Sequence, residues 1–588
     1  MLFTSLSSRC VASPVTPRQL ASLIVRVSSS MSPSPSTTLS PGDVVTLQCS
    51  DVAFGGDVCF LPYTHAAFIH SHYSHTTWSV DTRTRTKSKQ GVCKINADNK
   101  NYVIFVPRSL PGEVLTARIT STHRGYARAE KIGILQQHDH ATTPHCPYFL
   151  PHLDDTTQPY CGGCSFQSLL YPAQLSVKQH QVASLLHKIA KIPPERLDAL
   201  LQPIVPAPLQ YAFRNKMQFS VATASATREV IIGLHPPGSE TDIVPLQSCS
   251  IQSDTANAVL AHIAAYFLDL NKRHGNDDEA AAVVLRLRDV VIRHSLAYDN
   301  YLVHFITQGC PAAMAAPSLQ PLVDSLLENF NAGTKPTIIS CVHSNDTCDS
   351  SGENERRGRG RRQKGAKSTA AAAMEEKYEE VVMHGQGYLV EKLYGLQFKI
   401  SPSSFFQTNT KQAEKLVEAV LQKAELSAED VVLDLYCGAG ALSLPLAQRC
   451  RHVYGIELSE AATRDAQYNA QCNNVRNATF AAADLNKKSS IPVDVLQHVH
   501  VVVVDPARPG LSKHCIESLI LFGGGGMDGM ESSLRRLVYV SCNPSTQARD
   551  IALLCGSGIF ELKSVQCIDM YPQTSHVETI AVLDVSSQ

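Results

Sequence analysis

The stretch Val431-Val-Leu-Asp-Leu-Tyr-Cys-Gly-Ala-Gly440 decides the fold of the C-terminal third of this 588-residue chain. Its first five residues predict a buried strand, and the glycines that follow predict a tight turn before a helix that begins near Leu442. Further apolar runs lie at 452–456, 501–504, 537–540 and 579–583. Strands that alternate with helices predict an α/β fold with a parallel, doubly wound, Rossmann-like sheet over residues 401–588.

The glycine turn predicts a site for a nucleotide cofactor. Gly438 and Gly440 allow the backbone to approach a ligand at the carboxyl edge of the sheet. Glu457 ends the next strand about twenty residues later, where a carboxylate can hydrogen-bond ribose hydroxyls. A dinucleotide enzyme would share these parts, but position 443 is serine, so the Gly-x-Gly-x-x-Gly pattern that holds a pyrophosphate is absent. The pattern therefore favours S-adenosylmethionine, with a plain tight turn as the alternative.

Polar residues follow other strands of the same sheet. Asp505 and Cys542 each come directly after an apolar strand, so we expect both to face the cleft at the carboxyl edge. An Asp-Pro turn is the alternative for Asp505, and a buried, inert thiol is the alternative for Cys542. The polar neighbours of Cys542 favour an accessible thiolate nucleophile. His576 and Glu578 precede the last strand as candidate acids or bases, or as exposed loop residues.

The rest of the chain divides by composition. Residues 41–140 hold short β-type runs with turn residues between them, which predict a small barrel interrupted by an inserted loop at about 70–89. Residues 141–400 mix helical and strand patterns and predict a central domain of mixed structure. Its low-complexity stretch at about 344–379, with the basic run 356–362, predicts a disordered insert.

Cysteine spacing predicts a metal site in the central domain. The 18 cysteines lack the density of a disulfide scaffold, which favours a reducing compartment. Cys161-Gly-Gly-Cys164 forms a C-x-x-C unit, with Cys146 upstream and Cys249 downstream. Thiolates at such spacing bind zinc or an iron–sulfur cluster, and spacing alone does not choose between the two.

The N-terminal segment has the composition of a targeting sequence. Residues 1–40 contain three arginines, many serines and no Asp or Glu, which indicates a transit peptide for a plastid or a mitochondrion. A disordered tail on a cytoplasmic or nuclear protein is the alternative. No apolar run is long enough to cross a bilayer, so we expect no membrane partner. The net charge of −1 leaves an RNA partner open, because a local basic groove is enough to bind phosphates.

Joined with Ser404-Phe-Phe-Gln-Thr-Asn409 and with Asp569-Met-Tyr-Pro-Gln-Thr-Ser-His-Val-Glu578, these motifs closely resemble the RNA uracil-5-methyltransferase family. The resemblance runs from about residue 42 to the C-terminus without the inserts, and is strongest over 401–583. It implies methylation of uridine carbon 5 in rRNA or tRNA, with Cys542 as the nucleophile that adds to C6 and Glu578 as the general base. Residues that match the family's cofactor site are Gln407, Tyr436, Glu457, Asp484 and Asp505.

Two other regions extend the resemblance. Segments 165–174 and 214–217 resemble the branch of the family that carries a [4Fe-4S] cluster, whose four cysteine ligands match Cys146, Cys161, Cys164 and Cys249. Zinc stays the alternative. Residues 105–113 resemble a TRAM domain, which is a small OB-like RNA-binding barrel, with a generic β-barrel as the alternative. One departure is Ala441, where many family members carry an asparagine that contacts the cofactor. We expect a monomer.

Other functions predict other features. A non-catalytic RNA-binding protein with a methyltransferase-like fold would be expected to lose Cys542 or Glu578, and both are present. A cytosine-5 RNA methyltransferase would place its nucleophile in a different sequence context. An exocyclic-amine methyltransferase would normally carry an Asn/Asp-Pro-Pro-aromatic turn, where this chain has Asp505-Pro-Ala-Arg508.

Overall fold

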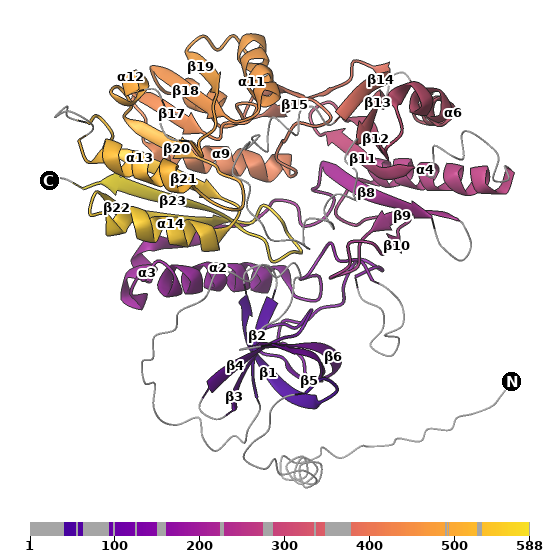
Figure 1. Ribbon diagram of the computed structural model, residues 1–588, viewed down its shortest axis with the longest axis horizontal. Helices are drawn as coiled ribbons and strands as arrows, with labels where there is room; N and C mark the ends of the chain where they lie inside the picture. The colour runs from indigo at the N-terminus through magenta and orange to yellow at the C-terminus, as the bar shows by residue number, and fades with distance from the viewer. Residues whose placement is uncertain are drawn as a thin grey trace, which may run out of the picture.

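A computed structural model gives the fold of the chain (Figure 1). It describes residues 40–53, 57–62, 93–97, 100–123, 126–149, 160–223, 229–273, 286–333, 337–346, 378–487, 491, 493–525 and 532–586. The transit-like segment before residue 40, the whole of the expected loop at 70–89 and most of the expected insert at 344–379 lie outside these residues. Among the described helices, none has the length and hydropathy needed to span a bilayer.

The N-terminal region folds as one curled sheet of six strands in the order β2-β1-β5-β6-β4-β3. The edge strands β2 and β3 contact each other, so the sheet closes into the small barrel that the sequence predicts. The strands are β1 (Val44–Ala53), β2 (Asp57–Pro62), β3 (Cys93–Ala97), β4 (Lys100–Phe105), β5 (Val114–His123) and β6 (Tyr126–Gln136).

The central region is a second sheet, in the order β10-β9-β8-β11-β12-β13-β14. Helices α4 (Asp254–Arg273) and α6 (Ala312–Phe330) cover one face of it with a continuous apolar core. The opposite face carries polar side chains such as Lys216, His304 and Ser344. The strands are β8 (Lys216–Thr223), β9 (Val230–Leu234), β10 (Val244–Pro245), β11 (Leu287–Ser295), β12 (Asn300–Gln308), β13 (Ile338–Asp346) and β14 (Tyr378–Gly385).

The C-terminal region is built on an eight-stranded sheet in the order β19-β18-β17-β20-β21-β23-β22-β7. The first five strands in this order are parallel, as the sequence predicts, but β23 runs antiparallel to both β21 and β22. The sheet is therefore mixed rather than wholly parallel. Its C-terminal strands are β17 (Val431–Leu435), β18 (His452–Glu457), β19 (Ala478–Ala482), β20 (Val501–Val504), β21 (Arg536–Ser541), β22 (Phe560–Ile568) and β23 (Glu578–Val585).

Helices cover both faces of this sheet. One face packs against α9 (Thr410–Ala424), α10 (Ser443–Ala447), α11 (Glu460–Cys472) and the hairpin of β15 (Leu389–Leu393) and β16 (Leu396–Ile400). The other face packs against α2 (Tyr171–Lys188), α3 (Pro194–Leu200), α12 (Val493–Leu496), α13 (Lys513–Gly523) and α14 (Pro544–Gly556). Both cores are apolar and buried, so the sheet is a rigid platform for residues at its carboxyl edge.

The eighth strand comes from outside the C-terminal segment. β7 (Leu201–Val205) pairs in parallel with β22, and the preceding helix α2 contacts α14, β22 and β7. Residues 171–205 thus complete a sheet that the sequence places within 401–588. Figure 1 shows α2 lying between the barrel and this sheet.

Candidate active site

A cavity of about 2040 Å³ lies between the carboxyl edge of the C-terminal sheet and the polar face of the central sheet. Every residue that the sequence assigns to the cofactor, to catalysis or to a metal lines this one cavity. They are Cys146, Cys161, Cys164, Cys249, Gln407, Tyr436, Glu457, Asp484, Asp505, Cys542 and Glu578. The fold therefore brings together side chains that are up to several hundred residues apart.

The glycine turn after β17 is held by Glu457. Tyr436 has a φ of 65°, and its N–H donates to the carbonyl oxygen of Ile456 at 2.8 Å, which turns the chain away from the sheet. One carboxylate oxygen of Glu457 accepts from the N–H of Gly438 at 3.1 Å, and the other accepts from Leu458 and Ser459. The carboxylate is thus fixed between the turn and the start of α11, facing the cavity, where a ribose would meet it.

Asp434 is a site residue that the sequence analysis quoted but did not assign. It is fully buried at the end of β17, and one oxygen accepts from the Ser443 hydroxyl at 2.5 Å. The other oxygen has no hydrogen-bond partner among the described residues. Burial, together with the charges of Asp505 and Glu457, raises the pKa of Asp434 to about 7. Its place at the end of an apolar strand, like that of Asp505, was the available signal.

Cys542 and Glu578 face each other because of the antiparallel pairing of β21 and β23. Ser541 is the last residue of β21 and pairs with Thr579, so the next residues on the two strands are Cys542 and Glu578. The Thr579 hydroxyl donates to the carbonyl oxygen of Ser541 at 3.2 Å, which fixes this end of the pair. A sulfur nucleophile and a carboxylate therefore share one point of the cavity wall.

The surroundings of Cys542 and Glu578 raise the pKa values of both side chains. Burial raises the pKa of the Cys542 thiol to about 12, and the charges of Glu578 and Asp505 add to this effect. Burial and Asp505 also raise the pKa of Glu578 to about 8, and burial raises that of Asp505 to about 6. Arg508 acts in the opposite direction on both Cys542 and Glu578. Its carbonyl oxygen also accepts from Asn543 at 2.8 Å, which ties its loop to that of Cys542.

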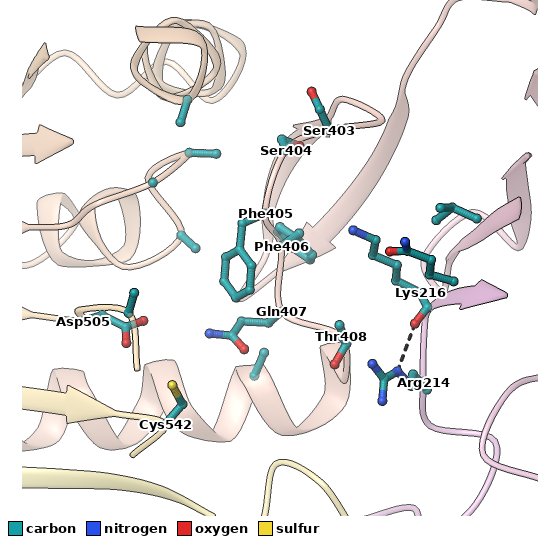
Figure 2. A pocket seen from close by; sticks show the side chains of 18 of the residues that line it. Arg214, Lys216, Ser403, Ser404, Phe405, Phe406, Gln407, Thr408, Asp505 and Cys542 are labelled. Carbon is teal, nitrogen blue, oxygen red and sulfur yellow. Dashed lines mark hydrogen bonds between the residues drawn. The ribbon is translucent and has the colours of Figure 1, made fainter. Parts of the chain in front are cut away.

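The loop 401–409 crosses the cavity opposite Cys542. Its backbone is anchored by Asn215, whose side-chain amide donates to the carbonyl oxygen of Gln407 at 2.9 Å. The side-chain oxygen of Gln407 is buried without a hydrogen-bond partner among the described residues. Figure 2 shows Gln407, Asp505 and Cys542 around the same space, and Phe405, which is 71% exposed, beside it. An unsatisfied buried acceptor at this position is suited to a donor on a bound ligand.

The central sheet supplies a basic wall to the cavity, to which the sequence analysis gave no role. Arg214 and Lys216 face the cavity, and the Arg214 Nε donates to the carbonyl oxygen of Lys216 at 3.0 Å (Figure 2). Burial, with Arg293 and Arg214 nearby, lowers the pKa of Lys216 to about 8. Cations gathered at a partly dry wall are suited to an anionic partner such as phosphate.

The four cysteines lie along one part of the cavity wall. Burial raises the pKa of Cys249 to about 12, and the other three thiols contribute through their charge, so the four are near one another. However, within the described ranges no three Cys, His, Asp or Glu side chains converge as metal ligands would. The structure therefore does not confirm the [4Fe-4S] cluster, nor zinc.

The barrel reaches this cysteine segment through Arg108. Its guanidinium donates to the carbonyl oxygen of Cys161 at 2.6 Å and to that of Phe149, and it lies 3.5 Å from the centre of the Tyr160 ring. These contacts desolvate the guanidinium, and burial lowers its pKa to about 10. The N-terminal barrel is thus joined to the central region beside the cavity.

Comparisons with known proteins agree with this geometry. Residues 378–585 match the family model for tRNA (uracil-5-)-methyltransferases, and residues 79–132 match the TRAM domain. The TRAM match begins inside the stretch 70–89 that we expected to be an inserted loop. A solved tRNA (uracil-54, C5)-methyltransferase from Pyrococcus abyssi, in complex with S-adenosyl-L-homocysteine, has the same fold with a TM-score of 0.52 and 23% identity. The match covers 84% of this chain and all of that one.

Curated relatives match more than four fifths of the chain. An RNA methyltransferase of Clostridium tetani that is itself uncharacterized is 30% identical over 493 residues, which is 83% of this chain and 94% of the relative. Another from Halalkalibacterium halodurans is 30% identical over 510 residues, which is 85% of this chain and 95% of the relative. The cavity, the family models and these relatives agree, and the chain belongs to the S-adenosylmethionine-dependent RNA uracil-5-methyltransferase family.

Proposed function

We propose that this enzyme methylates carbon 5 of a uridine in rRNA or tRNA through a covalent bond between Cys542 and C6 of the base. The observation that carries the proposal is the juxtaposition of Cys542 and Glu578 at the end of the β21–β23 pair. A nucleophile and a proton acceptor at one point are what this reaction requires, because both act on neighbouring atoms of one ring.

The chemistry assigns a step to each group. The thiolate of Cys542 adds to C6, and the electron pair of the C5–C6 bond moves toward O4, which makes C5 nucleophilic. S-adenosylmethionine, when bound, supplies the methyl group that C5 takes. The carboxylate of Glu578 then removes the C5 proton, the C5–C6 double bond forms again and the bond to sulfur breaks. The products are the methylated base, S-adenosylhomocysteine and a proton.

The high pKa values at the site bear on how the reaction begins. Burial and two nearby carboxyls raise the pKa of the Cys542 thiol and so favour its protonated form. Arg508 is the charge that opposes this effect, so it is placed to favour the thiolate. A bound S-adenosylmethionine carries a positive sulfonium, which would favour the thiolate and the ionised carboxyls in the same way.

The size and polarity of the cavity support an RNA substrate. A base within a helix cannot reach Cys542, so the target nucleotide must leave its stack and enter the cavity. Arg214 and Lys216 stand on the wall opposite the cofactor side, where they can hold the phosphates on either side of that nucleotide. The TRAM barrel adds a further RNA-binding module.

The test uses wild-type protein and transcripts of tRNA and of large-subunit rRNA that carry tritium at uridine C5. We expect label from methyl-labelled S-adenosylmethionine to enter one class of transcript, with release of an equal amount of tritium to water. Transcripts made with 5-fluorouridine should trap the enzyme as an adduct that survives denaturing electrophoresis, because fluorine cannot leave as a proton does. Methylation of cytidine instead, or no fluorouridine adduct, would contradict the proposal.

We also propose that Cys146, Cys161, Cys164 and Cys249 hold a [4Fe-4S] cluster. The support is their position on one wall, close enough for their charges to interact. Protein purified without oxygen should be brown, and its broad visible absorbance should disappear in the Cys161→Ser/Cys164→Ser variant. Cys472→Ser, at an exposed cysteine of α11 that does not line the cavity, is the control and should keep the colour. Stoichiometric zinc without iron would contradict the cluster.

A further inference from the structure

The loop between β22 and β23 determines where Glu578 lies. Glu578 is the first residue of β23 and pairs with Ile568, the last residue of β22, so the loop runs from Asp569 to Val577. A shift of this loop would move Glu578 relative to Cys542. Buried polar side chains of α2 make several hydrogen bonds to this loop and fix its position.

One of these contacts is an ion pair without solvent exposure. Lys178 on α2 donates to Asp569 at 2.5 Å, and both side chains are fully buried. The same ammonium donates to the carbonyl oxygen of Tyr571 at 2.9 Å. The second carboxylate oxygen of Asp569 accepts from the Tyr171 hydroxyl at 2.8 Å, and that hydroxyl accepts from the N–H of Ala207 at 2.7 Å.

Further contacts from the same helix face hold the middle of the loop. Gln573, with a left-handed φ of 66°, exchanges two hydrogen bonds with the side-chain amide of Gln174, at 2.9 and 3.1 Å. Its carbonyl oxygen accepts from the N–H groups of Ser165 and Phe166, both at 2.9 Å. The Ser165 hydroxyl accepts from the N–H of Ser575 at 2.9 Å. The segment that directly follows Cys164 thus also helps to fix the position of the β22–β23 loop.

The β22–β23 loop also contacts the start of α9, which directly follows the segment that carries Gln407. Asn409, the N-cap of α9, donates from its side chain to the carbonyl oxygen of Met570 at 3.1 Å. The N–H of Asp569 donates to the carbonyl oxygen of Val205 at the end of β7. The loop is therefore fixed between α2 and the segment that carries Gln407, and its position is determined from both sides.

We propose that Lys178 and Tyr171 are positioning residues for proton removal, which act through Asp569 on Glu578. Removing two charges from water costs free energy that a hydrophobic pair of the same size would not cost. A buried pair of this kind fixes geometry rather than adding stability, and a displacement of about 1 Å at a catalytic group can cost on the order of a hundredfold in rate. The inference rests on the proposed function, since it assigns Glu578 the removal of the C5 proton.

The test separates methyl transfer from proton release in a single turnover. Lys178→Met removes the ammonium, and the milder Tyr171→Phe removes one hydroxyl from the same network. The tritiated transcripts described above are mixed with excess enzyme and methyl-labelled S-adenosylmethionine. We expect methyl transfer to change by less than about threefold, while tritium release slows by about tenfold or more, so that a methylated protein–RNA adduct accumulates.

The control is an ion pair that involves β23, the strand that begins with Glu578. Arg536 donates to Asp584 at 2.7 Å between β21 and β23, at the end remote from Glu578. Arg536→Met should lower the melting temperature without changing the ratio of the two rates. If Lys178→Met does not fold, the ratio of the two rates in Tyr171→Phe tests the positioning role by itself.

Failure of the positioning role and failure of the proposed function would give different results. Equal slowing of both steps, or an unchanged ratio in the folded variants, would overturn the positioning role while leaving the proposed function intact. Wild-type enzyme that neither transfers methyl groups nor releases tritium would count against the proposed function itself.

Discussion

Replacing Cys542 with alanine should abolish methyl transfer, covalent capture of 5-fluorouridine RNA and release of the C5 proton together. Uracil C5 is too weak a nucleophile to take a methyl group until a sulfur atom has added to C6, so no later step can proceed without this thiol. We expect the rate to fall by about 10⁴-fold or more, as for the loss of other covalent nucleophiles. The measurement is a single turnover with methyl-labelled S-adenosylmethionine, followed by denaturing electrophoresis.

Cys555→Ala is the matched control. Cys555 is also a half-buried thiol of the C-terminal region, at the end of α14, and it does not line the cavity. This variant should keep wild-type turnover. Appreciable methyl transfer by Cys542→Ala would show that covalent catalysis is wrong, and Cys542 would then be only a wall residue of the cofactor cleft.

Replacing Glu578 with glutamine should have a different result. The amide keeps the size of the side chain but cannot accept the C5 proton. Attack by Cys542 and methyl transfer precede that step, so both should still occur. The enzyme should then stall as a protein–RNA adduct that carries the methyl label, because the bond between C6 and sulfur cannot break while the proton stays on C5. Turnover at the wild-type rate would remove Glu578 from its role.

The same variant provides its own test of folding. The pKa of Glu578 is raised to about 8 in the folded protein, from an ordinary value of 4.5. The folded state thus keeps a proton that the unfolded state has lost between these two values, and the wild-type free energy of unfolding falls as pH rises through this window. Glutamine has no such proton. Glu578→Gln should therefore be more stable than wild type by on the order of 5 kcal/mol above pH 8, and equal to it near pH 4.

Most of the parallel part of the fold was predictable, because β17, β18, β20 and β21 contain short apolar runs with glycines or polar residues after them. The parallel strand β19 was missed, since only Phe480 of its five residues is buried. The run 431–435 and the residue Glu457 alone indicate a sheet with a ligand at its carboxyl edge. The antiparallel β23 was not predictable, because the run 579–583 looks the same in either direction. The edge strand β7 was also missed, since its five residues include a proline and have no partner close in sequence.

The proposed catalytic pair shows the same limit. Cys542 and Glu578 were each found from a local motif, but their facing positions follow from the register between Ser541 and Thr579, which a single sequence does not contain. Asp434 and Arg508 lie within the recognised motifs, but no role could be predicted for them, because the burial of Asp434 and the effect of Arg508 on Cys542 exist only in the assembled cavity. The basic pair Arg214 and Lys216 was missed because the net charge of the chain is near zero.

The strand β7 and the helix α2 also affect the order in which the protein can fold. Lys178 and Asp569 are 391 residues apart in sequence, and the ribosome makes α2 and β7 long before β22 exists. Contacts of such high sequence separation form late and slow folding, because a long loop must close first. Until Asp569 has been synthesised, Lys178 on α2 cannot form its ion pair with that carboxylate. The proposed catalytic site is therefore completed only when the last strands of the chain have been added, so a chain that ends before β23 cannot place Glu578 opposite Cys542.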